Sequence, residues 1–131
     1  MSFQESKNIK CLDARNQGKV DYDRKYDILY FKVKGREYKK SIEVGDLMLD
    51  VDTEDFVTGI QVFDAVKRFR LPQEALQMIE RWALHSRIED GVVTVQLTFT
   101  ADENGKLREK SLDVVCASKG LHDAEVHCSV D

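Results

Sequence analysis

Residues 20–65 alternate apolar and polar side chains almost without a break, and short clusters containing Gly or Asp interrupt the alternation at short intervals. Successive side chains of a strand point to opposite faces, so a period of two indicates strands with one buried and one solvated face. Within segment 28–34, for example, Leu29, Phe31 and Val33 fall on one face. The stretch therefore predicts an antiparallel β-meander, around which the rest of the chain is organised.

Gly45-Asp46 is the turn that specifies the register of the meander. Gly at the first central position suits a type II′ turn, which places Ile42 opposite Leu49. The apolar pattern then brings Leu49 next to Ile60. A slip of one residue would turn all of these side chains to the other face, so the predicted register is self-consistent.

Residues 66–86 predict the main helix of the chain. Asp64 ends the last strand of the meander and is placed to cap a short helical turn, and Pro72 suits the first position of the longer helix that follows. Apolar residues then recur at helical spacing, namely Ala75, Leu76, Ile79, Trp82 and Ala83. We expect Trp82 to fill the core between helix and sheet. His85 is expected near the helix end, where the last carbonyls favour a cation.

Residues 91–118 predict a second hairpin. Between Val93 and Phe99 every second residue is apolar, and Asn104-Gly105 is a strong signal for a type I′ turn. With those two residues in the loop, Leu97 faces Leu112, and Val95 and Val93 face Val114 and Cys116. All of these apolar side chains then lie on one face of the hairpin.

Together these patterns predict an α+β fold, in which one main helix covers an antiparallel meander and a C-terminal β-hairpin follows. A chain of 131 residues fits a single domain, because it is long enough to bury its own core. Its segments are the meander at 20–65, the helical segment at 66–86 and the hairpin at 91–118. The polar tails at 1–19 and 119–131 are each either flexible or an edge strand.

Charge and cysteine content restrict the class of protein. The net charge of −4 argues against a nucleic-acid-binding protein and against binding to an anionic membrane. Basic residues gather in 24–40 and acidic residues in 41–65, and we expect these neighbouring segments to complement each other across strands. The three cysteines are an odd number in scattered positions, which does not indicate a disulfide framework. With no signal-like or membrane-spanning apolar run, a cytoplasmic location is expected.

The meander also resembles a family of short prokaryotic proteins, domain of unknown function twenty-two eighty-three. The resemblance rests on Tyr22-Asp23, Asp27-Ile28-Leu29-Tyr30, Leu49-Asp50-Val51-Asp52 and Gly59-Ile60-Gln61-Val62-Phe63-Asp64-Ala65. Two positions depart from the family pattern. Asp55 replaces its turn glycine, and Val66 replaces the serine that follows its Asp-Ala pair.

The resemblance implies an antiparallel sheet with one helix and no established activity. Some members look like partners of small toxin-like proteins, which implies a binding role. Within the family-like motif the candidate functional residues are Tyr22, Asp27, Tyr30 and Asp64. Tyr in strands and Asp at strand ends are also common for purely structural reasons, and we favour that interpretation.

Neither acidic nor histidine-containing segments predict a metal site. The run 50–55 lacks the Gly and the Glu that an EF-hand loop needs, since Asp55 and Gln61 stand at those positions. The C-terminal segment carries metal-ligating residue types without the usual paired spacing, namely Cys116, His122, Asp123, His127 and Cys128. There is also no nucleophile elbow and no phosphate-binding glycine loop, so no metal, cofactor or catalytic residue is predicted.

The sequence thus favours a cytoplasmic, non-catalytic module that binds another protein and forms a homodimer. The alternative is a small hydrolase or metal-dependent enzyme that uses the Asp-rich turns. Dimerisation is expected because open strand edges and an apolar outer face favour a partner. The outer-face residues in question are Ile28, Tyr30, Met48, Val57 and Phe63.

Overall fold

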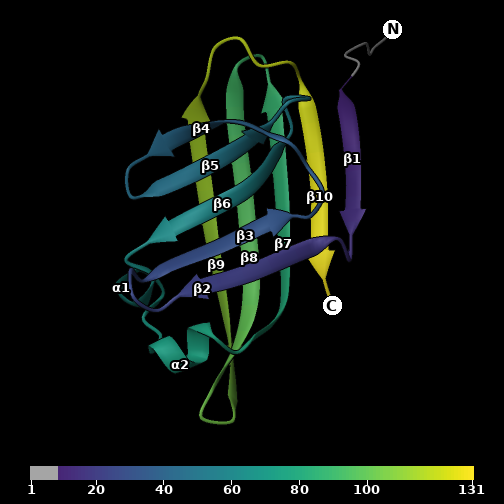
Figure 1. Cartoon of the computed structure of the whole chain (residues 1–131). Coiled ribbons are helices and arrows are strands. Elements are labelled where there is room, and N and C mark those ends of the chain that lie inside the picture. The colour runs from purple at the N-terminus through teal and green to yellow at the C-terminus, as the bar shows by residue number, and fades with distance from the viewer. Residues whose placement is uncertain (1–8) are drawn as a thin grey trace, which may run out of the picture.

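The computed structural model describes residues 9–131, which form two five-stranded sheets packed face to face. In Figure 1 the strands of the front sheet cross those of the back sheet at a steep angle, as in orthogonal sheet packing. Both sheets contribute buried apolar side chains to one continuous core. The molecule is therefore a β-sandwich, to which two short helices are attached at one end.

The order of strands in each sheet mixes early and late parts of the chain. The front sheet has the order β2 (Gly18–Asp23), β3 (Ile28–Val33), β6 (Val57–Phe63), β5 (Leu47–Asp52) and β4 (Tyr38–Val44). The back sheet has the order β1 (Lys10–Arg15), β10 (Ala124–Val130), β7 (Ile79–Glu89), β8 (Val92–Glu103) and β9 (Lys106–Ala117). The helices are α1 (Ala65–Phe69) and α2 (Gln73–Leu76).

The front sheet confirms the predicted meander and its register. Ile42 pairs with Leu49 across the β4–β5 hairpin, and Leu49 pairs with Ile60 of β6. Val57, which we expected on the outer face, instead lies in the core with 1% of its surface exposed. An irregularity in the β5–β6 register pairs Val57 with inward-facing Val51 and so turns it toward the core.

The second hairpin is confirmed as well. Leu97 pairs with Leu112 across β8 and β9, and Val95 pairs with Val114. Asn104 and Gly105 have φ angles of 53° and 83°, as a type I′ turn requires at both central positions.

The predicted α+β class and its main helix are wrong, because the chain is mostly strand and most of 66–86 is not helical. Helix α2 begins directly after Pro72 but ends at Leu76, and β7 starts at Ile79. The register of β7 with β8 is irregular near Ile79. After that point every second residue is buried, beginning with Trp82 and Leu84, which is the period of a strand. Pairing with β8 on one side and β10 on the other satisfies the backbone of β7, and this long-range pairing outweighs local helix propensity.

Asp64 also differs from its predicted role. It precedes α1 in a left-handed conformation with a φ of 53° and makes no side-chain capping hydrogen bond. A capping residue normally has extended backbone geometry, which lets its side chain reach the first amides of the helix. Asp64 therefore takes the predicted position directly before α1, but its side chain does not cap the helix.

Trp82 fills the core as expected, although it does so from a strand rather than a helix. Its ring packs edge-on against Phe31 of the front sheet, with ring centroids 5.1 Å apart. Phe31 in turn packs on Phe99 of the back sheet. A Cβ atom at Gly18 would lie 2.3 Å from the Trp82 ring, so the side chain of Trp82 occupies the space that Gly18 leaves free.

Both tails contribute edge or near-edge strands within the described residues. Strand β1 pairs with β10 in parallel, with Lys10 opposite Ala124 and Arg15 opposite Ser129. Residues 1–8 of the N-terminal tail lie outside the described residues. None of the described helices is long and apolar enough to cross a membrane.

Candidate functional site

The first group of family-like residues joins the β2–β3 turn to α1. The Tyr22 hydroxyl donates a 2.6 Å hydrogen bond to the Asp27 carboxylate, which also accepts the Val66 amide at 3.2 Å. The amide of Ala65 donates to the Asp27 carbonyl. Burial, together with the hydrogen bond to Asp27, raises the pKa of Tyr22 to about 12. These contacts fix the start of α1 and leave Tyr22 a poor proton donor to a substrate near neutral pH.

The second group lies on the outer face of the front sheet. The carboxylate of Asp50, itself only 6% exposed, accepts hydrogen bonds from Tyr30, from Ser41 at 2.9 Å and from Gln61 at 3.2 Å. The Tyr30 ring lies against Gly59, where a Cβ atom would approach Tyr30 Cε1 to 3.2 Å. Burial, aided by the contact with Asp50, raises the pKa of Tyr30 above its ordinary value. The carboxylate of Asp50 is therefore satisfied by hydrogen bonds from side chains of the protein.

The four family-like candidates are therefore divided between two hydrogen-bonded groups. Tyr22 and Asp27 belong to the first, and Tyr30 belongs to the second with Asp50. Asp64 adjoins the first group only through its neighbour Ala65, whose amide contacts Asp27. Asp50, which closes the second group, falls within the acidic run and was not among the candidates.

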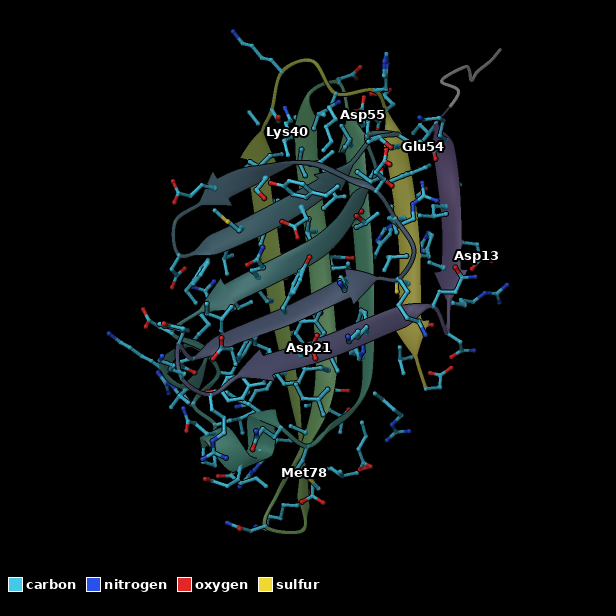
Figure 2. All side chains as sticks on the ribbon, in the orientation of Figure 1. Asp13, Asp21, Lys40, Glu54, Asp55 and Met78 are labelled. Atoms are coloured by element: carbon cyan, nitrogen blue, oxygen red, sulfur yellow. The ribbon has the colours of Figure 1, made fainter. Side chains whose placement is uncertain are left out.

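Two residues of the basic segment, Arg36 and Lys39, pair with carboxylates of the acidic turn at 50–55. Asp52 accepts a 2.8 Å hydrogen bond from Arg36 and also accepts two backbone amides of its own turn. Asp55 pairs with Lys39 at 2.5 Å and accepts the His122 amide at 3.0 Å. Figure 2 shows Asp55 beside Glu54 at the same end of the molecule. The predicted complementarity of the basic and acidic segments is confirmed for Arg36 and Lys39.

Asp55 is a buried carboxylate that two protein groups hold. Burial would raise its pKa, but the hydrogen bonds from Lys39 and from the His122 amide outweigh that effect, and the pKa is lowered. Asp55 also has a φ of 67°, which is the left-handed conformation that the family's turn glycine would adopt with less strain.

The metal-ligating residues of the C-terminal segment do not form one cluster. Cys128 is buried, and burial raises its pKa to about 11. Cys116 lies on β9, two strands away from β7 in the back sheet and three from β10. His122 lies beside Asp55, whereas His127 stacks on His85.

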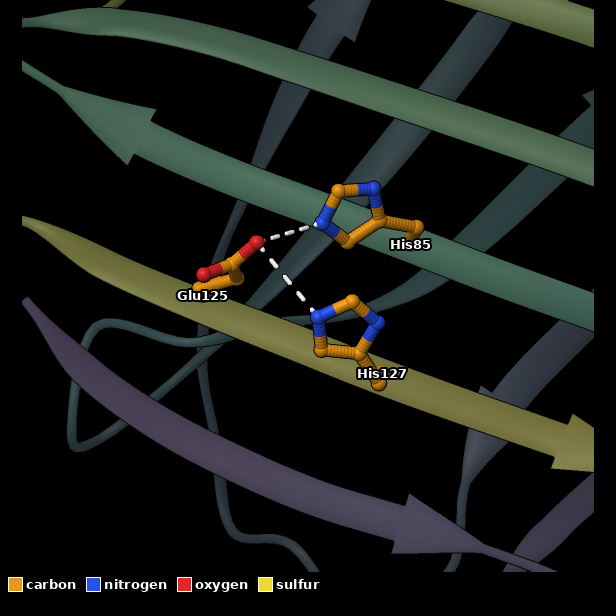
Figure 3. A group of neighbouring side chains, drawn as sticks. All are labelled: His85, Glu125 and His127. Atoms are coloured by element: carbon orange, nitrogen blue, oxygen red, sulfur yellow. Dashed lines mark hydrogen bonds and ion pairs between the residues drawn. The ribbon is translucent and has the colours of Figure 1, made fainter.

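A compact His–Glu–His cluster occupies the outer face of the back sheet (Figure 3). His85 on β7 lies directly opposite His127 on β10, and their rings stack with centroids 4.3 Å apart. Glu125 lies two residues before His127 on the same strand face. Its Oε2 atom is 2.7 Å from His85 Nε2 and 3.4 Å from His127 Nε2.

Neighbouring polar groups hold this cluster in place. Arg87 Nη1 is 3.3 Å from the other carboxylate oxygen of Glu125, and Gln96 Oε1 is 3.4 Å from His85 Nδ1. The hydrogen bond with His85 lowers the pKa of Glu125; burial opposes this effect, and the Arg87 charge reinforces it. The carboxylate of Glu125 is therefore ionised at neutral pH.

Sequence reasoning missed this cluster for two reasons. It placed His85 on a helix, and it weighed His127 only against other residues of the C-terminal segment. The available signal was Glu125-Val126-His127, because residues two apart share one face of a strand. Pairing that motif with His85 required knowledge of the β7–β10 register.

Comparisons with known proteins agree with the family resemblance. Residues 19–65 match the family described as Protein of unknown function (DUF2283), which covers the meander from β2 to the start of α1. No solved structure matches the chain.

Two archaeal proteins are similar to this chain over longer stretches. A Methanosarcina mazei protein named "Putative hypoxanthine phosphoribosyltransferase" is 27% identical over 97 residues, which is 74% of this chain and 79% of that protein. An uncharacterized protein of Methanocaldococcus jannaschii is 26% identical over 80 residues, which is 60% of this chain and 69% of that protein. The family match and the similarity to the uncharacterized protein support a protein of unknown function.

Proposed function

We propose that the protein is a non-catalytic, cytoplasmic binding module that forms a homodimer through strand β9. The observation that carries the proposal is the position of β9 at the edge of the back sheet. Among the described strands, only β8 pairs with β9, and its twelve residues run without a register shift. Long, regular edges present unpaired backbone groups and readily accept another strand.

The two halves of β9 differ in how they protect this edge. Basic side chains cover the half next to the turn, namely Lys106, Arg108 and Lys110. The half at 111–117 has Asp113 as its single charged residue, and Val115 leaves 70% of its surface exposed. Val92, 46% exposed, pairs with Ala117 at the same end of the hairpin. We therefore place the dimer contact at 111–117, where the second copy would cover Val115.

The proposal favours binding over catalysis because the acidic residues of the front sheet are already engaged. Asp27, Asp50, Asp52 and Asp55 each accept hydrogen bonds from protein groups. A hydrolase that used these carboxylates would have to break those contacts. The free thiols of the cysteines fit the reducing conditions of a cytoplasm.

Our proposal does not include the phosphoribosyltransferase activity that the name of the Methanosarcina mazei protein gives. Transfer of a phosphoribosyl group requires a site that holds phosphate, and proteins commonly build one from a glycine-rich loop that leads into a helix. Within residues 9–131 the helices span five and four residues, and neither follows a glycine-rich loop.

Light scattering on the full chain, measured over a range of concentrations, tests the dimer. We expect a mass twice the 15.1 kDa of one chain, and we expect Val115→Lys to shift the mass to that of a monomer. Leu107→Lys is the matched control, since Leu107 is 58% exposed on the charged half of the same strand. A wild-type monomer at every concentration, or equal behaviour of the two variants, would contradict the proposal.

A further inference from the structure

We propose that His85, Glu125 and His127 bind a divalent first-row transition-metal ion on the outer face of the back sheet, with zinc as the best-suited ion. Nε2 of each histidine and Oε2 of Glu125 would be the ligand atoms. Potential ligand atoms of the three residues all lie within 4.8 Å of one another. Imidazole and carboxylate groups are the nitrogen and oxygen ligands that zinc commonly takes in proteins.

One pair of ligand atoms already has the spacing of a tetrahedral zinc site, whereas the two stacked rings, whose planes differ by 13°, would have to turn to direct both Nε2 atoms at one ion. Zinc bonds of about 2.0–2.2 Å in a tetrahedral site separate neighbouring ligand atoms by roughly 3.3–3.6 Å. Glu125 Oε2 and His127 Nε2 are already 3.4 Å apart. The 2.7 Å contact between Glu125 Oε2 and His85 Nε2 would have to open slightly, as the ion replaces their hydrogen bond.

The sheet supplies the rigid support that such a site needs. His85 and His127 are paired across adjacent antiparallel strands, so their Cβ atoms are held at a separation that both imidazoles can bridge. Figure 3 shows both rings presenting a nitrogen to the same carboxylate oxygen. No loop has to move to bring the three side chains together.

Residues around the cluster contact those nitrogen and oxygen atoms of His85 and Glu125 that would not bind the metal. Arg87 contacts Oε1 of Glu125 and leaves Oε2 directed at the histidines. Gln96 Oε1 lies 3.4 Å from His85 Nδ1, where it can accept a hydrogen bond from Nδ1–H once the ion replaces the hydrogen bond of Nε2 to Glu125. Outer-shell partners of this kind orient metal ligands.

The cluster is open on its solvent side. The side chains of His127, His85 and Glu125 are 58%, 36% and 17% exposed. A shallow pocket adjoins the cluster, lined partly by Arg15, Ala83 and Ser129. A zinc ion held by three protein ligands keeps a coordination position for water or an added ligand, so the inferred site is an open one rather than a closed structural one.

Calorimetric titration of the full chain with zinc chloride tests the inference. We expect one zinc ion per chain. His85→Ala and His127→Ala should each weaken binding by more than about tenfold, the lower end of the loss seen even for outer-shell partners. His122→Ala is the matched control, because the chain has three histidines and the His122 side chain is 83% exposed beside Asp55.

Two further measurements keep the test decisive. Cobalt(II) bound to the wild-type chain should give visible absorption bands that His85→Ala removes, while circular dichroism confirms that the variant is folded. Cys11→Ser should leave binding intact, although Cys11 Sγ lies 4.0 Å from Glu125 Oε1. The inference is overturned if zinc does not bind, or if His122→Ala or Cys11→Ser weakens binding as much as His85→Ala does. All three ligands belong to one chain, so the result does not depend on dimerisation.

Discussion

Carboxylates of the front sheet that look like catalytic acids in the sequence have structural partners in the fold. Asp27 accepts hydrogen bonds from a tyrosine hydroxyl and from a helix amide. Asp50 accepts hydrogen bonds from three side chains. A buried carboxylate without such partners would be costly. These residues therefore stabilise turns and strand contacts, and the cluster with unused coordination capacity lies on the other sheet.

Asp55 should make the stability of the fold depend on pH in the acidic range. Its pKa in the folded chain lies below the ordinary value of 3.8. Its contribution is therefore fully present at pH values above 3.8 and is lost as the pH falls through the folded-state pKa. Asp55→Asn can keep the left-handed backbone but loses the ion pair with Lys39.

We expect this variant to be less stable than the wild type by about 1.5–3 kcal/mol at neutral pH, the usual value of hydrogen bonds to a charged group. The difference should shrink below pH 3.8, because the wild-type carboxyl then becomes protonated. Urea unfolding of both proteins at a series of pH values measures this difference in the free energy of unfolding. A difference that stays constant into the acidic range would show that Asp55 does not act through its charge.

At the scale of elements, the patterns that were predicted correctly are local and strictly periodic. Strands β3 and β8 alternate cleanly, and their turns carry Gly at positions that need positive φ. Strand β7 could not be predicted in this way, since Ala83 breaks its apolar alternation and Ser86 is a buried polar residue. The hydroxyl of Ser86 donates a hydrogen bond to the carbonyl of Val57, a partner on the other sheet.

The β8–β9 turn provides a direct test of an element that was predicted from sequence. Replacing Asn104-Gly105 by Val-Val places β-branched residues at φ angles of 53° and 83°. The strain should lower the free energy of unfolding by about 2 kcal/mol or more. Thr98→Val, at an exposed site within β8, is the control and should be nearly neutral. Thermal unfolding measures both, and an unchanged midpoint for the turn variant would contradict the turn assignment.

At the scale of the molecule, the arrangement depends on contacts between residues far apart in the chain. The β1–β10 pairing joins Lys10 to Ala124, and the His–Glu–His cluster joins His85 to Glu125. Neither pairing leaves a local signal in the sequence, because strand periodicity says which face a residue occupies but not which strand lies beside it. The meander was therefore predictable, whereas the sandwich and the cluster required the fold.

The two sheets should unfold together, since they share one core. Trp82 is the one tryptophan of the chain, and its ring lies between the sheets against Phe31. Its fluorescence therefore reports on the contact between sheets, whereas far-ultraviolet circular dichroism reports on the strands of both. At one protein concentration the two urea transitions should coincide, as in cooperative unfolding of a single domain. A fluorescence transition that clearly precedes the loss of strand signal would mean that the sheets separate before they unfold.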